Sequence, residues 1–218
     1  MFASTLPPVG CPPPVLPLSD LELRRLADEG WFTREGFLGE GLALEARAAC
    51  VALAEADALR AAGIRRGAEH TVDRDLRGDE AAWLADHLGV PALRAVAEQF
   101  EALRGVVNAG AWLGLTEVNL QVARYPGGGA RYRRHLDAFP GAFNRVLTAI
   151  VYLNPGWQPD DGGRLALWTP GRPTIDPVLD RLVVFLSERV PHAVEPAWAE
   201  RWAITGWFRK PDPSAPLL

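Results

Sequence analysis

Hydrophobic positions change their spacing along the chain near residue 110. Before that point, apolar residues recur at helical intervals, and Ser19-x-x-Glu22 forms a capping box ahead of the first such segment. Pro91 stands at a first helical position. Residues 31–37 indicate a short strand, and the polar residues 64–78 a loop or a projecting hairpin. The helices expected are 19–30, 40–62, 79–87 and 91–108.

Beyond residue 110, short apolar stretches alternate with turns rich in Gly, Pro and Asp, such as Pro126-Gly127-Gly128-Gly129. Seven or so short strands at this regular spacing indicate a sandwich or barrel. No internal repeat and no second core is evident, so the helices are expected to buttress a β core. The strands expected are 115–125, 131–137, 145–153, 164–168, 181–186, 193–195 and 201–208.

The domain organisation follows from this division. We expect an N-terminal arm over residues 1–18 and a single domain over 19–212, with helical support over 19–110 and the β core over 111–210. Six prolines in the first seventeen residues favour an extended chain in the arm. We favour a loose arm without function; the alternative is an arm that packs on the domain or recruits a partner.

Composition narrows the class of protein. The 218 residues are 48% hydrophobic and 23% charged, as in ordinary soluble domains. A net charge of −4 argues against a dedicated nucleic-acid binder, and no apolar run reaches the ~18 residues needed to span a membrane. The proline-rich start does not match a signal peptide. We therefore expect a cytoplasmic protein with free thiols at Cys11 and Cys50.

A candidate metal site emerges from three residues. His135 and Asp137 are spaced i, i+2 on an expected strand and so point to the same face. His192 opens a later strand, and the chain holds only four histidines in all. Two histidines and one carboxylate on a β framework are the facial triad of non-heme Fe(II) oxygenases. The alternative is a surface histidine hydrogen-bonded to its neighbouring aspartate.

Arg201 and Tyr152 extend this candidate site. A buried guanidinium can bind a distal carboxylate through two hydrogen bonds, and a tyrosine hydroxyl can add a third donor. Arg201 follows His192 by nine residues on the next expected strand, and Tyr152 lies on the strand over 145–153. The alternative for Arg201 is an ordinary surface arginine on a strand.

These residues lie within a longer resemblance, which covers about residues 25–210. The chain resembles the 2-oxoglutarate/Fe(II) dioxygenase superfamily, and more narrowly the prolyl 4-hydroxylases of the hypoxia-inducible-factor type and their bacterial relatives. The matching stretches are 75–79 (DLRGD), 123–127 (ARYPG), 132–137 (YRRHLD), 150–154 (IVYLN), 162–165 (GGRL), 180–185 (DRLVVF), 191–194 (PHAV) and 201–208 (RWAITGWF).

The resemblance implies a double-stranded β-helix, a jelly-roll variant, that uses Fe(II), 2-oxoglutarate and O2, with ascorbate as a candidate reductant. His135, Asp137 and His192 would bind iron, while Arg201 and Tyr152 would bind the C5 carboxylate of 2-oxoglutarate. The rest of the cosubstrate pocket would be lined by Tyr125, Ile150, Leu165, Val194, Thr205 and Trp207. Candidate substrate contacts are Tyr132, Arg77, Asp79 and Arg145. The alternative for Arg77 and Asp79 is that they are partners that stabilise the finger-like segment 64–79.

The resemblance implies hydroxylation of a prolyl residue in a protein or peptide, with a translation factor as one expected target by analogy. A second reading is an oxygenase acting on a small molecule, such as a free amino acid. A third is nucleic-acid demethylation, for which Arg131, Arg133 and Arg134 could contact phosphate, but the acidic balance speaks against it. A fourth, a cupin-like binding module without catalysis, disagrees with the complete ligand set. We expect a monomer with no nucleic-acid and no membrane partner.

Overall fold

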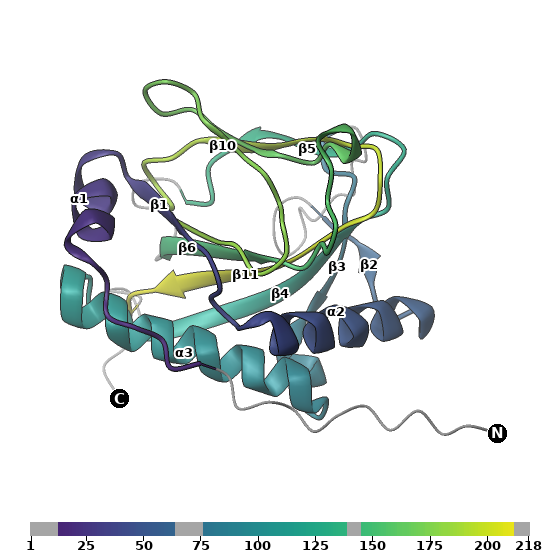
Figure 1. Ribbon diagram of the computed structural model, residues 1–218, viewed down its shortest axis with the longest axis horizontal. Helices are drawn as coiled ribbons and strands as arrows, with labels where there is room; N and C mark the ends of the chain where they lie inside the picture. The colour runs from purple at the N-terminus through teal and green to yellow at the C-terminus, as the bar shows by residue number, and fades with distance from the viewer. Residues whose placement is uncertain (1–12, 64–75, 139–144, 212–218) are drawn as a thin grey trace.

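Two antiparallel sheets face each other in the computed structural model, which describes residues 13–63, 76–138 and 145–211 (Figure 1). The seven-stranded sheet has the order β1-β9-β6-β11-β4-β3-β2, and the four-stranded sheet the order β5-β10-β7-β8. The expected mainly β fold is confirmed. The larger sheet contains β1 (Trp31–Arg34), β2 (Arg60–Ala61), β3 (Glu80–Trp83), β4 (Glu117–Tyr125), β6 (Arg145–Tyr152), β9 (Leu182–Leu186) and β11 (Arg201–Arg209). The smaller contains β5 (Ala130–His135), β7 (Leu165–Leu167), β8 (Thr174–Ile175) and β10 (His192–Ala197).

Helices cover the outer face of the larger sheet. In Figure 1, α2 (Glu40–Glu55) and α3 (Pro91–Ala111) run beneath β4 and β11, and α1 (Asp20–Asp28) lies near β1. The capping box predicted at Ser19 is present at the start of α1. Two short 3-10 helices, η2 (Leu84–His87) and η3 (Pro159–Asp161), complete the described elements.

Strand alternation separates the structural core from the space between the sheets. On β6, Leu147 and Val151 pack against the helices, while Ile150 and Tyr152 face the other sheet. Successive side chains of a strand point to opposite faces, so β6 contributes both to the helix-covered core and to the space between the sheets. The apolar residues that flank the functional side chains therefore belong to a second cluster, distinct from the helix-covered core.

Two helix predictions were wrong. Residues 79–87 do not form one helix: they form β3 followed by η2, because β3 pairs with β4 along the sheet edge. The helix predicted over 40–62 ends at Glu55; Asp57 adopts a left-handed backbone with φ of 54°, and the chain turns into β2. Tertiary pairing overrides helix propensity in short segments. The N-terminal half is thus only partly helical and gives three strands to the large sheet.

The N-terminal arm is not loose over its described part. Gln99 Nε2 donates a hydrogen bond of 3.1 Å to the Pro13 carbonyl, and Leu18 is buried in the core. The alternative prediction, an arm that packs on the domain, therefore holds for residues 13–18. The remaining arm residues 1–12, the polar segment 64–75 and the loop 139–144 lie outside the described residues.

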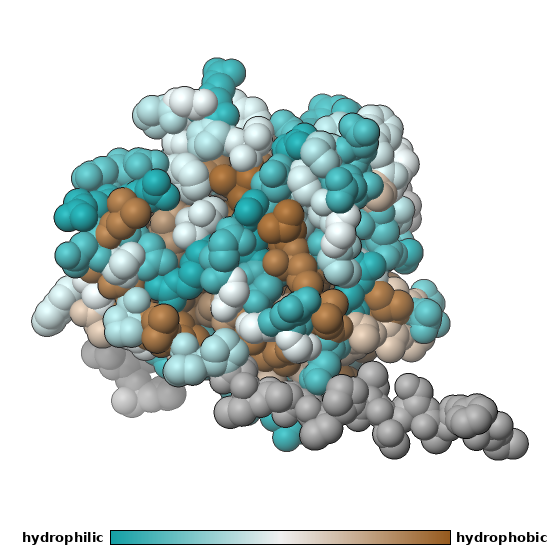
Figure 2. All heavy atoms as spheres, in the orientation of Figure 1, coloured by the Kyte–Doolittle hydropathy of each residue, from teal (hydrophilic) through white to brown (hydrophobic). Residues whose placement is uncertain are grey.

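The surface is mixed in character. Apolar side chains reach it in several patches between hydrophilic ones (Figure 2). Trp112, Leu16 and Trp198 are the most exposed of the large apolar residues described. Across the described ranges, no helix has both the length and the apolar character that a membrane crossing requires.

Candidate active site

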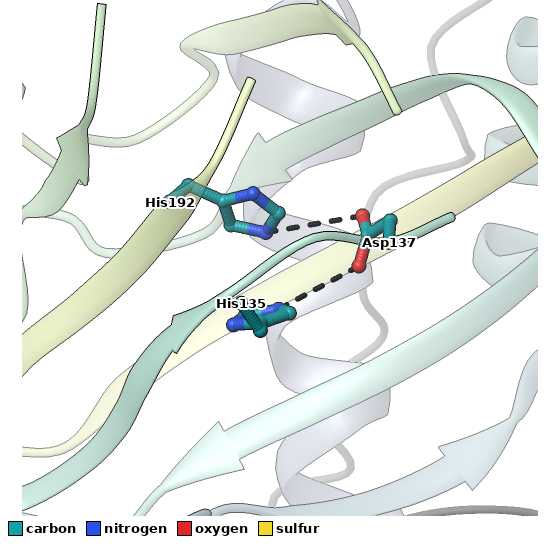
Figure 3. Close-up of side chains that lie close together, drawn as sticks. All are labelled: His135, Asp137 and His192. Atoms are coloured by element: carbon teal, nitrogen blue, oxygen red, sulfur yellow. Dashed lines mark ion pairs between the residues drawn. The ribbon is translucent and has the colours of Figure 1, made fainter. Parts of the chain in front are cut away.

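Three side chains with metal-binding atoms meet between the sheets. His135 closes β5, Asp137 follows it by two residues, and His192 opens β10 opposite His135 in the strand register. Their ligand atoms all lie within 4.8 Å of one another. His135 Nε2 is 3.6 Å from Asp137 Oδ1, and His192 Nε2 is 3.8 Å from Oδ2 (Figure 3). Asp137 lies just beyond the strand rather than on it, contrary to the prediction, yet it converges with both histidines.

Backbone carbonyls orient both imidazoles. His135 Nδ1 lies 2.8 Å from the Arg133 carbonyl, and His192 Nδ1 lies 3.1 Å from the Val190 carbonyl. A carbonyl only accepts hydrogen bonds, so each Nδ1 carries the proton in these contacts. The Nε2 lone pairs are then directed at Asp137, as in histidines that bind metals.

The protonation states suit a divalent cation. Burial lowers the pKa of His192 to about 4, against the opposing effect of Asp137, so its imidazole is neutral at pH 7. Burial alone would raise the pKa of Asp137, but attraction to the protonated forms of His192 and His135, which exist at low pH, and a hydrogen bond from Thr148 outweigh it and hold that pKa below its usual range. Metal ligands must be deprotonated to bind. The donor set therefore fits Fe(II), for which two imidazoles and one carboxylate are typical.

A second polar centre lies around Arg201, which opens β11 and is 3% exposed. Its Nε donates a hydrogen bond of 2.8 Å to the Gly163 carbonyl, and its guanidinium lies 4.9 Å and 5.0 Å from the ring centres of Tyr125 and Tyr152. Within the described ranges, no carboxylate forms an ion pair with Arg201. A buried cation without a counter-ion is costly, so this pocket fits an anionic ligand.

The Tyr152 hydroxyl points to the same conclusion. It is buried and has no hydrogen-bond partner among the described residues. Burial raises the pKa of Tyr152 to about 12, although Arg201 partly opposes this, so the hydroxyl keeps its proton at neutral pH. The site thus offers one unused hydroxyl donor beside one unneutralised guanidinium, which is the chemistry that a carboxylate of 2-oxoglutarate requires.

The remaining predicted pocket residues lie on the inner faces of the strands. Ile150, Leu165 and Val194 are buried in the cluster between the sheets. Thr205 and Trp207 share the face of β11 that carries Arg201, because they follow it at even spacing. Trp207, however, lies toward the metal end of the site, where the Arg145 guanidinium stacks over its ring at 4.3 Å.

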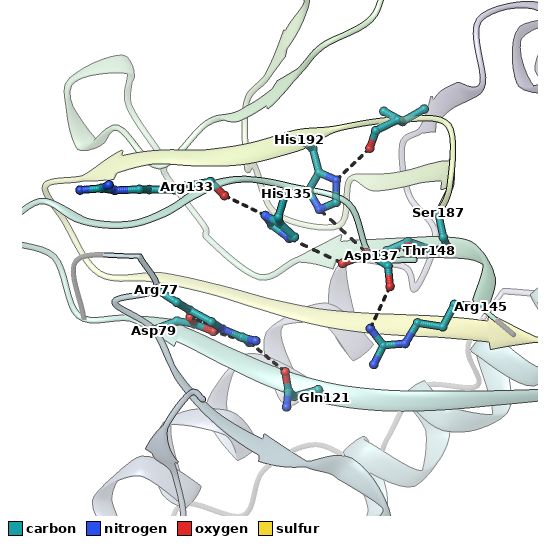
Figure 4. A network of polar contacts seen from close by, with 11 residues as sticks. Arg77, Asp79, Gln121, Arg133, His135, Asp137, Arg145, Thr148, Ser187 and His192 are labelled. Atoms are coloured by element: carbon teal, nitrogen blue, oxygen red, sulfur yellow. Dashed lines mark hydrogen bonds and ion pairs between the residues drawn. The ribbon is translucent and has the colours of Figure 1, made fainter. Parts of the chain in front are cut away.

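Three of the predicted substrate residues, Arg77, Asp79 and Arg145, lie in the polar network around the triad (Figure 4), and the fourth, Tyr132, contacts His135. The Tyr132 ring stacks on His135 at 3.6 Å, and Arg77 covers the ring from 4.8 Å. Arg77 also holds Asp79 through hydrogen bonds of 2.7 Å and 2.9 Å. Asp79 is only 2% exposed, and its carboxylate is held by Arg77. Its role in substrate contact or in stabilising the segment 64–79 stays a prediction, because residues 64–75 lie outside the described residues. Arg145 donates to the Asp137 backbone carbonyl at 3.4 Å.

Three residues of the site were missed from sequence. Thr148 and Ser187 form a hydrogen-bonded pair that reaches Asp137, and Gly163 supplies the carbonyl that orients Arg201. The available signal for Thr148 was a lone threonine within the otherwise apolar or aromatic run 146–152. Gly163 left only a Gly-Gly pair in a turn. Neither pattern predicts the hydrogen-bond partner of the residue, because the partners lie far away in sequence.

Together, a jelly-roll pair of sheets, a His-Asp-His cluster and a buried arginine define a non-heme Fe(II) oxygenase scaffold. Comparison with known proteins agrees. The sequence profile of the 2OG-Fe(II) oxygenase superfamily matches residues 120–209. Human "Prolyl hydroxylase EGLN3" is 37% identical over 145 residues, which are 62% of this chain and 59% of that protein. The chain thus spans about three fifths of this curated relative.

Two solved structures are similar over most of the chain. A prolyl-4-hydroxylase from Pseudomonas putida superposes with a TM-score of 0.78 and 36% identity, covering 88% of this chain and 98% of that one. A prolyl hydroxylase of Trichoplax adhaerens, solved with a hypoxia-inducible-factor peptide fragment, gives a TM-score of 0.78 at 31% identity, covering 88% of both chains. This chain therefore belongs to the 2-oxoglutarate/Fe(II) oxygenase superfamily, and within it to the prolyl hydroxylase type.

Proposed function

We propose that this protein is an Fe(II)- and 2-oxoglutarate-dependent dioxygenase that hydroxylates a prolyl residue in a protein or peptide. The observation that carries the proposal is the presence of two separate polar centres in the space between the two sheets. One is the His-Asp-His cluster, and the other is the buried Arg201 without a carboxylate partner among the described residues. A single ligand with a chelating end and a distal carboxylate would satisfy both centres.

In this proposal, His135, Asp137 and His192 hold the iron, while Arg201 and Tyr152 hold the C5 carboxylate of 2-oxoglutarate. When bound, Fe(II) and 2-oxoglutarate supply the oxidising chemistry that transfers one atom of O2 to a C–H bond and releases succinate and CO2.

The chain itself binds, orients and excludes water. The rings of Tyr125 and Tyr152 flank the Arg201 guanidinium, and their apolar faces lower the local dielectric. The Gly163 carbonyl fixes the Arg201 side chain through Nε, which leaves the two terminal nitrogens to face the ligand. The apolar residues Ile150, Leu165 and Val194 keep this end of the site dry.

Prolyl hydroxylation is supported by the relatives that share most of this chain's length, which are prolyl hydroxylases by name. The Trichoplax adhaerens protein was solved with a peptide, so a peptide substrate is the nearest analogy. On this chain, Tyr132, Arg77 and Arg145 are the described residues that we assign to the substrate side of the triad. A translation factor as target, ascorbate as reductant, a monomeric state and a cytoplasmic location are further parts of the proposal.

The test supplies the full chain with Fe(II), 2-oxoglutarate and O2, together with a library of proline-containing peptides. We expect succinate release and the gain of one oxygen atom at a prolyl residue, both measured by mass spectrometry. Asp137→Ala should abolish both, whereas Asp28→Ala, an exposed carboxylate at the end of α1, should change neither. Oxygen gained only by a free amino acid, and by no peptide, would replace this proposal with the small-molecule reading.

A further inference from the structure

A chain of two buried hydroxyls lies behind the metal-binding carboxylate (Figure 4). Thr148 Oγ1 donates a hydrogen bond of 2.7 Å to Asp137 Oδ2, and the Ser187 hydroxyl lies 2.9 Å from Thr148 Oγ1. Both residues are fully buried. Thr148 comes from β6 and Ser187 directly follows β9, so two neighbouring strands of the large sheet build this pair.

The direction of these hydrogen bonds follows from the charge on Asp137. An ionised carboxylate only accepts, so Thr148 must donate its single hydroxyl proton to Oδ2. The contact between the two hydroxyls then requires Ser187 as donor and Thr148 as acceptor. The order Ser187 to Thr148 to Asp137 is therefore fixed, and each link supports the next.

The surroundings make a hydroxyl at this position hard to explain by packing. Thr148 is paired with Phe185 on β9 and with Trp207 on β11, and directly opposed residues share a face of the sheet. The next residues on the same face of β6 are Ile150 and Tyr152. A hydroxyl buried among such side chains costs free energy unless it is hydrogen-bonded. Among the described metal-binding side chains, Thr148 forms a hydrogen bond with Asp137.

Asp137 needs such support because it lies beyond the end of β5. The strand ladder fixes the backbone of His135 and His192, which pair with each other, but not that of Asp137. With Oδ2 held by Thr148, rotation of the carboxylate is restrained and Oδ1 stays directed toward His135 Nε2 at 3.6 Å. Partners that orient metal ligands in this way contribute about 10- to 100-fold to metal affinity.

We propose that Thr148 and Ser187 are positioning residues that set the metal affinity of the site by holding the Asp137 carboxylate. The inference rests on the proposed function, since it takes the triad as the metal site. It assigns to the β6–β9 pair a role in the metal centre that is separate from the cosubstrate pocket at the other end of β6.

The test measures binding of Mn(II) alone, as a redox-inert substitute for Fe(II), to the full metal-free chain by isothermal titration calorimetry. Thr148→Val keeps the volume but removes the hydroxyl, and should weaken Mn(II) binding by about 10- to 100-fold. Thr148→Ser restores the hydroxyl and should return the affinity close to that of the wild type. Ser187→Ala leaves the donor to Asp137 in place and should give an intermediate loss.

Thr33→Val is the matched control, because Thr33 is a half-buried strand threonine on β1, the edge strand beside β9 in the same sheet, and makes no contact with Asp137 among those described. It should bind Mn(II) as the wild type does. Wild-type affinity in Thr148→Val, or equal weakness in Thr148→Ser and Thr148→Val, would overturn the positioning role. Wild-type affinity in Ser187→Ala would remove Ser187 from it. Should Thr148→Val not fold, Mn(II) binding by Thr148→Ser and Ser187→Ala still tests the positioning role. Failure of the wild type to bind Mn(II) would refute the proposed function as well.

Discussion

Replacing Tyr152 by Phe should weaken 2-oxoglutarate binding and stabilise the empty protein at the same time. The change removes one oxygen atom from a fully buried ring and leaves the rest of the side chain in place. That oxygen has no hydrogen-bond partner among the described residues, although it lies in the pocket beside Arg201. The unsatisfied hydroxyl therefore lowers the stability of the empty protein. In our account it forms a hydrogen bond only when a carboxylate is bound.

The two effects have separate magnitudes. A hydrogen bond to a charged group is worth about 1.5–3 kcal/mol, so the dissociation constant of 2-oxoglutarate should rise roughly 10- to 150-fold. An unsatisfied buried hydroxyl costs about 1–3 kcal/mol. Taking 1 kcal/mol of that as recovered in Tyr152→Phe, the melting temperature of the empty protein should rise by about 2–4 °C for a chain of this size.

Both quantities can be measured on the same preparation. Anaerobic calorimetry in the presence of Mn(II) gives the affinity for 2-oxoglutarate, and calorimetric unfolding of the metal-free protein gives the melting temperature. A melting temperature that falls by several degrees, combined with an unchanged affinity, would show that the Tyr152 hydroxyl is structural. That result would refute the reasoning about the Arg201 pocket.

Three further outcomes are expected. Gly163→Ala should weaken 2-oxoglutarate binding, because it places a Cβ 2.8 Å from Arg201 Cδ at a φ of +70°. The control Gly156→Ala has the same backbone strain, with a φ of +69°, but no atom near the new Cβ, and should leave binding unchanged. Equal effects of the two variants would contradict a role for the contact with Arg201. Burial raises the pKa of all three tyrosines above 10 in the folded protein. Unfolding at high pH therefore releases protons, and the free energy of unfolding should fall as the pH rises above about 10, the tyrosine pKa in the unfolded chain. Denaturant unfolding at several pH values would show this fall, and a tyrosine of the folded protein that titrates at its ordinary pKa would contradict it. In a Cys11→Ser background, Cys50, whose pKa burial raises to about 12, should react with a thiol reagent only on unfolding, and fast reaction of the native protein would contradict its burial.

Predictions succeeded where the physical signal is local. The capping box at Ser19 identified α1, because both of its hydrogen bonds are made within one turn. The strands β4, β6 and β11 were found because apolar runs between turns are long enough to recognise. The convergence of His135, Asp137 and His192 was predicted because two nearby residues of these types, with a later histidine, are typical of one metal chemistry.

Predictions failed where a distant partner decides the structure. Residues 80–83 become a strand only because the edge of β4 offers hydrogen bonds, and nothing local indicates that edge. The same holds for the site. Thr148 and Ser187 are 39 residues apart, and Gly163 and Arg201 are 38 apart, so their contacts are created by the sheet and not by a motif. Even the course of residues 13–18 depends on Gln99, which belongs to α3.

The central claim is that His135, Asp137, His192 and Arg201 form one site that binds Fe(II) and 2-oxoglutarate together. The most direct measurement is an anaerobic titration of the full chain with 2-oxoglutarate, with and without Fe(II), followed by visible absorbance. Our account predicts a new absorbance band that requires both components and is lost in Asp137→Ala. Absence of any Fe(II)-dependent band in the wild type would contradict the account.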